Sequence, residues 1–240
     1  MIRLFKHISL FVILLAFMVS AISCKDENDV PTVVQPSNTG VFTDPRDGEQ
    51  YPWVEYNGTQ WMTENYRYEI NSYADCRNYI EDRDWVDYAA EQHATRNRAK
   101  YGMYYTLEGA LRACPEGWRL PTDEDWQKLE MAMGMSSADV SRFEWRGNIA
   151  QTMVSTKDQT TYTNFLLGGI VTYHVYTNLR NGSLYKGAWG YYWTNSTDKN
   201  KNGTFYIYRK FAYNRKEIFR QSMEPQNQLL SVRYCRDTPR

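Results

Sequence analysis

The stretch ACPEGWRLPTDEDWQKLE, residues 113–130, predicts the junction between two short helices. Thr106 can cap the start of the first helix, and Pro115 and Gly117 are residue types that end it, so this helix should stop just before them. Thr122 is a typical N-cap, and Asp125 stands three residues later, where it completes a capping box. The second helix should therefore begin at this threonine.

Apolar residues recur at helical spacing on both sides of the junction. The first helix carries Leu107, Ala110, Leu111 and Cys114, and the second carries Trp126, Leu129 and Met133. Spacings of three and four residues place each set on one face of its helix, so both faces should be buried. The Cys114 thiol is accordingly expected to point inward.

Three consecutive carboxylates, Asp123, Glu124 and Asp125, open the second helix. Acidic side chains in a first turn are stabilised by the helix dipole and by backbone N–H groups that lack helical partners. General acid catalysis or metal binding would need a second titrating group close by, and the local sequence supplies none. The cluster is predicted to cap the helix, and we predict no catalytic residue.

Most of the remaining sequence has the pattern of strands and turns. Asn57-Gly58 separates two short strand-like runs, and both residue types accept the positive φ of a type I′ hairpin turn. The same dipeptide returns at Asn181-Gly182 and Asn202-Gly203. These observations predict one α+β domain, residues 41–240, in which two short helices pack on twisted antiparallel sheets and loops are abundant.

Residues 67–100 form a distinct segment with alternating charges and few aliphatic side chains. We predict a surface insertion that is partly helical after Asp82 and carries Cys76. Long connections of this kind are often either functional or disordered, and composition leaves both possibilities open.

Residues 1–23 have the pattern of a signal peptide. Arg3 and Lys6 form a positive start, and the apolar run from Leu10 to Val19 is shorter than the roughly 20 residues that a membrane-spanning helix needs. The small residues before Cys24 resemble the lipobox of bacterial lipoproteins, in which the cysteine is lipidated and becomes the mature N-terminus. The alternative is a secretory peptide in which this cysteine is incidental.

Residues 24–40 are polar, contain two prolines and show no periodicity, so they are predicted to form a lipidated tether. The run Lys25–Asp29 is similar to the acidic signal that sends lipoproteins of the Bacteroidetes to the outer surface. That resemblance implies a lipid-anchored protein of the outer membrane that faces the cell exterior.

Charge and residue spacing exclude several partners. Without Arg3 and Lys6 the chain has 26 basic and 28 acidic residues, so no single-signed field recruits nucleic acid. His93 and His174 have neither a second histidine nor a paired cysteine at metal-ligand spacing, and no cofactor loop is recognisable. We predict no metal, no cofactor and no nucleic-acid partner.

The sequence from Phe165 onward is unusually aromatic. An exposed row of such rings would stack on sugars, whereas a loop-rich fold also uses rings to fill its core. The candidate ligand contacts are Trp189, Tyr191 and Trp193, and burial in the core is their alternative role.

Several motifs occur in an order that resembles a known family. They are Asp44–Gly48, Gln60–Asn65, Tyr104–Thr106, Ala113–Thr122, Gly168-Gly169, Tyr192–Thr194 and Ser231–Arg233. Over roughly residues 41–238 they resemble the Fibrobacter succinogenes major paralogous domain, and CPEGWRLPT is the most specific of them. This family is similar to the C-type lectin-like fold and, more distantly, to sulfatase-modifying enzymes.

The resemblance implies a disulfide, because lectin-like domains join a cysteine of the first helix to one of the last strand. Here it would pair Cys114 with Cys235 and leave Cys76 without a partner. In the family the last cysteine directly follows the arginine, whereas Tyr234 separates Arg233 from Cys235 in this chain. A shift of one residue turns a side chain to the opposite face of a strand unless a bulge absorbs it.

The anchor and the resemblance together imply a non-catalytic binding or adhesion domain at the cell surface, with a glycan or a protein as ligand. Glu224-Pro225-Gln226-Asn227 follows Trp193-Thr194-Asn195, which reverses the order of the lectin calcium motifs, so no calcium site is expected. Sulfatase-modifying enzymes use a cysteine pair late in the chain, where only Cys235 stands, so we predict that the protein is not an enzyme. The alternatives are a structural accessory of a surface assembly or an enzyme related to that fold.

Overall fold

The computed structural model describes residues 33–79, 90–172 and 182–239. The predicted signal peptide, Cys24 and His174 lie outside these ranges. Strand β1 (Asn38–Thr43) begins within the segment assigned to the tether, so the folded part starts before Val41. None of the helices in these ranges has the length and the apolar character needed to cross a bilayer.

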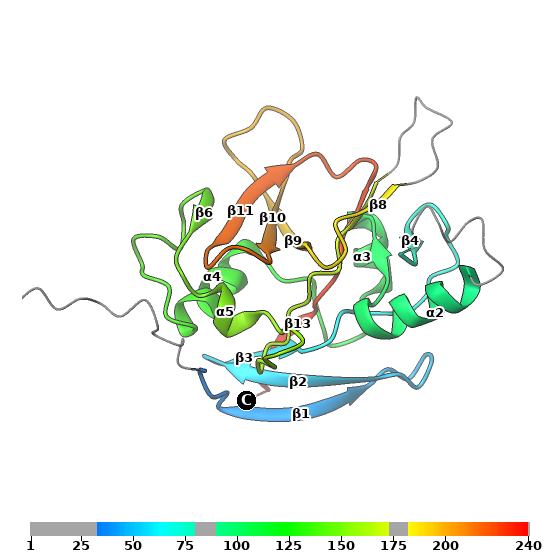
Figure 1. Ribbon diagram of the computed structural model, residues 1–240, viewed down its shortest axis with the longest axis horizontal. Helices are drawn as coiled ribbons and strands as arrows, with labels where there is room; N and C mark the ends of the chain where they lie inside the picture. The colour runs from blue at the N-terminus through cyan, green and yellow to red at the C-terminus, as the bar shows by residue number, and fades with distance from the viewer. Residues whose placement is uncertain (1–32, 80–89, 173–181, 240) are drawn as a thin grey trace, which may run out of the picture. The chain divides into compact units, whose positions relative to one another are not determined.

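The N-terminal sheet has the strand order β1-β2-β3-β13 and is antiparallel throughout. It adds β2 (Gln50–Tyr56), β3 (Thr59–Met62) and β13 (Cys235–Asp237) to β1, so the last strand of the chain returns to the first sheet (Figure 1). Asn57 and Gly58 join β2 to β3 with φ angles of 49° and 74°, which confirms the predicted hairpin.

The central sheet has the order β6-β11-β10-β9 and is also antiparallel. Its strands are β6 (Glu144–Arg146), β9 (Trp189–Thr197), β10 (Tyr206–Ala212) and β11 (Ile218–Met223). The register between β9 and β10 shifts near Tyr206, where one strand carries a bulge.

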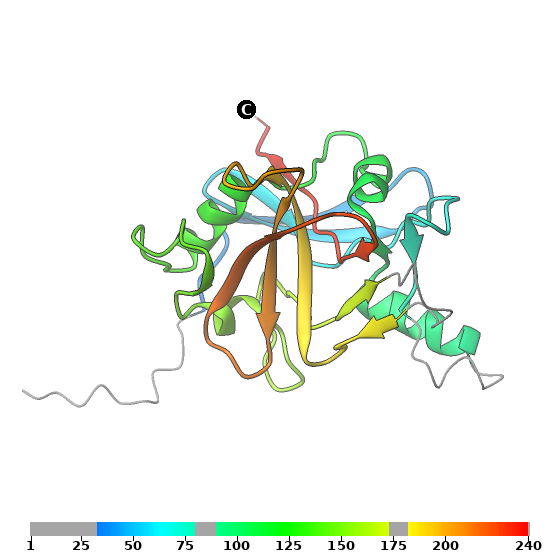
Figure 2. The ribbon, with the colours of Figure 1, turned by 90° about the horizontal axis from the view of Figure 1, so that it is seen from above.

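Two small sheets complete the strand structure. One has the order β12-β7-β8 and consists of β7 (Ile170–Thr172), β8 (Gly182–Leu184) and β12 (Gln228–Leu229). The other pairs β4 (Cys76–Arg77) with β5 (Tyr104–Tyr105). Strands β7 and β8 lie beside the start of β9 (Figure 2), and Gly169, directly before β7, forms a bridge with Gly190 of β9.

The described helices are α2 (Ala90–Tyr101), α3 (Leu107–Ala113), α4 (Asp123–Ala132) and α5 (Ala150–Met153). Helix α2 supplies the helical part expected within residues 67–100. With few, short helices and antiparallel sheets, the fold is α+β, as predicted.

The predicted caps of α3 and α4 are confirmed. Thr106 accepts a hydrogen bond from the Gly109 backbone N–H at 3.0 Å. Thr122 accepts one from Asp125 N–H at 3.1 Å, while the Asp125 carboxylate accepts one from Thr122 N–H at 2.8 Å, which closes the capping box.

Helix α4 lies between the two four-stranded sheets (Figure 1) and joins them through one tryptophan. The Trp126 ring lies 5.3 Å from Trp61 of β3 and 6.3 Å from Phe211 of β10, between ring centroids. Phe165 packs 5.0 Å from the same ring. This apolar core fixes the orientation of the central sheet relative to α4.

The segment 67–100 is not purely a surface insertion. Cys76 is 4 % exposed and Tyr79 is 3 % exposed, and the Cys76 sulfur lies 3.6 Å from that of Met103. Burial raises the pKa of the Cys76 thiol to about 11. Pairing of β4 with β5 draws this part of the segment into the core, an arrangement that its charged composition did not indicate.

The predicted bridge between Cys114 and Cys235 is absent from the described residues, in which both thiols are free. Tyr234 points toward α3, since its hydroxyl donates a hydrogen bond to the Ala110 carbonyl. Cys235 instead packs in the cluster around Trp126. Adjacent residues of an extended chain point to opposite sides, so the extra residue before Cys235 turns its side chain away from α3.

Candidate functional site

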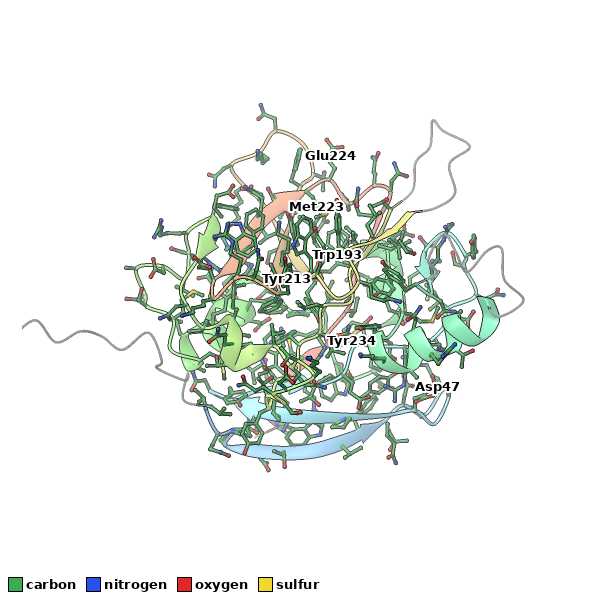
Figure 3. All side chains as sticks on the ribbon, in the orientation of Figure 1. Asp47, Trp193, Tyr213, Met223, Glu224 and Tyr234 are labelled. Atoms are coloured by element: carbon green, nitrogen blue, oxygen red, sulfur yellow. The ribbon has the colours of Figure 1, made fainter. Side chains whose placement is uncertain are left out.

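The three aromatic residues singled out from the sequence lie on one side of β9, but they differ in exposure. Trp193 is fully buried, and its indole N–H donates a hydrogen bond to the Tyr105 carbonyl at 2.8 Å. Tyr191 is 7 % exposed, and Trp189 is partly exposed. Trp193 therefore belongs to the core (Figure 3), and the row is open to solvent only near the start of β9.

The same side of the central sheet carries further rings. We call it the aromatic face, and its members are Trp145, Trp189, Tyr191, Trp193, Tyr206, Tyr208, Lys210, Phe219 and Met223. Across the strands, Lys210 stands opposite Phe219 on β11 and opposite Tyr191 on β9. Phe219 in turn stands opposite Trp145 on β6. Cross-strand neighbours of this kind touch on one face of a sheet.

Lys210 is the only charged member of the aromatic face. Its ammonium nitrogen lies 4.1 Å from the ring centroid of Phe219, 4.8 Å from that of Trp189 and 5.0 Å from that of Trp145. Contacts within about 6 Å of a ring centroid are cation–π interactions. Burial lowers the pKa of Lys210, an effect that the nearby Glu144 carboxylate opposes.

A tight turn places another ring at the edge of the aromatic face. Tyr185 is 45 % exposed, and its ring centroid lies 4.2 Å from that of Trp189. Two backbone N–H groups, those of Ala188 and Trp189, donate to the Tyr185 carbonyl, each at 2.9 Å. Gly169 packs closely against the residue that precedes this turn. A Cβ at position 169 would lie 2.2 Å from the Leu184 carbonyl oxygen, so this position requires glycine.

The opposite face of the central sheet holds a buried ion-pair network against α4. Its members are Asp123, Glu130, Arg146, Arg209 and Arg220. Glu130 accepts hydrogen bonds from Arg146 and Arg209, both at 2.6 Å. Asp123 accepts one from Arg209 at 2.8 Å and one from Arg220 at 2.7 Å. These alternate positions face α4, which is why the aromatic face points away from it.

The acidic stretch of α4 thus has three structural environments. Asp125 caps the helix and pairs with Arg119, and Glu124 is exposed. Asp123 is 4 % exposed and pairs with two arginines, a role that the local sequence did not reveal. The sequence signal for a buried acidic partner is Arg209, because it lies on the same side of its strand as the apolar residues Ile207 and Phe211.

The network predicts acid sensitivity. Burial alone would raise the pKa of Asp123, but Arg220 and Arg209 outweigh it and hold the pKa well below its usual value. The stabilisation is present above the unfolded pKa of about 3.9 and is lost as pH falls. Asp123→Asn should therefore be less stable than the parent chain at pH 7, and this difference in the free energy of unfolding should narrow by on the order of 1 kcal/mol by pH 3.

Urea unfolding at pH 7, 5, 4 and 3 measures this gap. Asp158→Asn is the control, because Asp158 is exposed and forms no ion pair with any of the described residues. A gap that stays constant between pH 7 and pH 3 would contradict the role assigned to Asp123.

The described part of the chain contains no candidate metal site. Within those ranges, no group of three or more histidine, cysteine, aspartate or glutamate side chains is placed to hold a metal ion. His174 lies outside them.

The structure defines an α+β domain. Ion pairs connect one face of its central sheet to α4, and aromatic rings lie on the other face. A family model described as the Fibrobacter succinogenes major domain (Fib_succ_major) matches residues 54–236, and the chain belongs to this family. No curated protein and no solved structure matches the chain.

Proposed function

We propose that the protein is a non-catalytic binding or adhesion protein, held at the outer face of the outer membrane by a lipid on Cys24. The proposal includes a lectin-like arrangement of the Fibrobacter succinogenes major domain, supported by the ordered motifs and the α+β fold. The observation that carries the binding role is the partly exposed end of the aromatic face, formed by Tyr185, Trp189 and Lys210.

The exposure and chemistry of this end favour recognition of a ligand. Aromatic rings with one accessible side supply apolar area with little loss of conformational freedom on binding, which makes them common contact residues. Tyr213 follows β10, is 71 % exposed, and its N–H donates to the Ala188 carbonyl at 2.9 Å, beside the same turn. The carboxylates Asp123 and Glu130, by contrast, are already paired with buried arginines, so the proposal gives them a structural role.

Binding by the full chain in detergent tests the proposal. A glycan array and a pull-down with surface proteins should each be run with the parent chain, with Trp189→Ala and with Tyr162→Ala. Tyr162 is 39 % exposed but lies outside the aromatic face, so it is the matched control. Loss of Trp189 should weaken binding roughly 30-fold, the effect of removing a contact worth about 2 kcal/mol.

Two results would count against the proposal. One is silence of the parent chain across both polysaccharides and proteins, and the other is unmodified Cys24 in protein isolated from its own membranes, as measured by mass spectrometry. The first result removes the binding role, and the second removes the anchor.

A further inference from the structure

Within the described ranges, the ammonium group of Lys210 forms no direct ion pair. Among the described residues none accepts a hydrogen bond from it or forms an ion pair with it, and its contacts are with rings. The charged side chains that act on the pKa of Lys210 are Glu144, which raises it, and Arg215, which lowers it. Glu144 already accepts a hydrogen bond from the Gln221 amide at 2.7 Å, and Arg215 places a second cation 5.1 Å from the Trp145 ring centroid.

The two edges of the aromatic face share an unusual backbone conformation. Five non-glycine residues in the described ranges have positive φ, and three of them are asparagines, which tolerate it. The other two are Glu144 and Tyr185, each with φ of 68°. Glu144 precedes Trp145 in β6, and Tyr185 packs on Trp189. Strain of this type persists where the surrounding structure enforces it, and it is concentrated at ligand sites.

From these observations we infer that the partly exposed end of the aromatic face, at Tyr185, Trp189 and Lys210, binds a carboxylated glycan, a polysaccharide that contains uronic acid residues. The inference rests on the proposed binding function and specifies its ligand class. Tyr185 and Trp189 stack on the apolar C–H side of a sugar ring, and the ammonium of Lys210 donates hydrogen bonds to the carboxylate on that ring.

Charge complementarity selects this occupant over a neutral glycan. A cation that is partly withdrawn from water gains more from an anion than an exposed cation does, because the local dielectric constant is lower. The rings beside Lys210 withdraw it partly from water, and no described residue accepts a hydrogen bond from its ammonium group. A carboxylate on the stacked sugar supplies that acceptor.

The test measures binding of the full chain in detergent by calorimetry. The probes are polygalacturonate, alginate and hyaluronate, each beside its carboxyl-reduced form, in which every carboxylate has become a neutral CH2OH group. Dextran sulfate reports on charge without uronic acid. At least one uronate should bind about tenfold or more tightly than its reduced form, as expected for hydrogen bonds to a charged group.

Substitutions locate the effect. Lys210→Met keeps the length of the side chain and its packing on the rings, and should abolish the preference for the uronate over its reduced form. Lys210→Arg should retain the preference. Lys128→Met removes an exposed lysine from α4, on the other side of the central sheet, and should change nothing. Unfolding temperatures of the four proteins verify that each is folded.

Each outcome decides the inference. A preference for one uronate that disappears in Lys210→Met supports it. Equal binding of uronate and reduced glycan, equal or tighter binding of dextran sulfate, or a preference that survives in Lys210→Met overturns it while the broader binding function stands. Failure of all seven probes also overturns it, and the glycan array and the pull-down then decide the broader function separately.

Discussion

Glu130→Gln is expected to lower the free energy of unfolding by about 3 to 5 kcal/mol, the effect of removing one partner from a buried ion pair. Glu130 is fully buried and accepts hydrogen bonds from Arg146 and Arg209, both at 2.6 Å. Glutamine keeps the shape but removes the charge. Arg146 then has no carboxylate partner, and Arg209 retains only Asp123.

Thermal and urea unfolding measure this effect. For a domain of this size each kcal/mol shifts the Tm by about 2 to 4 °C, so a fall of about 6 to 20 °C is expected. Glu124→Gln is the matched control, because Glu124 is exposed on the same helix and should change the stability by less than about 0.5 kcal/mol. If both variants unfolded within 2 °C of the parent chain, the network would not hold the sheet to α4 as described.

Local rules account for the parts of the fold that the sequence predicted. The caps at Thr106 and Thr122 and the hairpin at Asn57-Gly58 each depend on a few neighbouring residues, so their chemistry is visible in a short window. The structure confirms all three. The α+β class follows from such windows, because helical and strand-like periods are themselves local.

Pairings between distant segments were not predictable in the same way. The return of β13 to β3 places Cys235 opposite Trp61 across the N-terminal sheet, and the local sequence contains no sign of that register. The resemblance supplied an expected disulfide, but the outcome depends on which side of the last segment faces α3. Tyr234 takes that side, so the thiol of Cys235 lies in the other apolar cluster.

In the candidate site, too, the local features were visible in the sequence and the long-range contacts were not. The candidate contacts Trp189, Tyr191 and Trp193 occupy alternate positions of β9 and therefore share one face, since successive strand residues point to opposite sides. Their exposure depends on what covers them: the segment of Tyr105 covers Trp193, whereas Trp189 at the start of β9 stays partly exposed. Lys210 was not singled out, because its rings come from three other strands.

Arg233→Met is expected to prevent accumulation of folded protein. Arg233 is 1 % exposed and donates hydrogen bonds to the Asn65 side chain at 2.6 Å, to the Met62 carbonyl at 3.0 Å and to the Thr163 carbonyl at 2.9 Å. It also donates to the Asn164 carbonyl. Burial lowers its pKa to about 10, so the guanidinium remains charged at neutral pH. The guanidinium therefore joins three distant parts of the chain. Two of the residues involved, Asn65 and Arg233, belong to the motifs that resemble the family.

Methionine fills part of the volume but leaves four acceptors without their donor, three of them buried and the Asn164 carbonyl partly buried. Each such loss costs about 1 to 3 kcal/mol, so the total of roughly 4 kcal/mol or more is comparable with the whole stability of many domains, about 5 to 15 kcal/mol. Soluble yield, circular dichroism and urea unfolding measure the outcome. Arg236→Met is the control three residues further along the chain, because Arg236 is partly exposed and its side chain hydrogen-bonds the Gln60 side chain, at 2.7 Å, and not a buried carbonyl. An Arg233→Met protein as stable as Arg236→Met would show that the buried guanidinium is dispensable, and the motifs around Asn65 and Arg233 would then need another explanation.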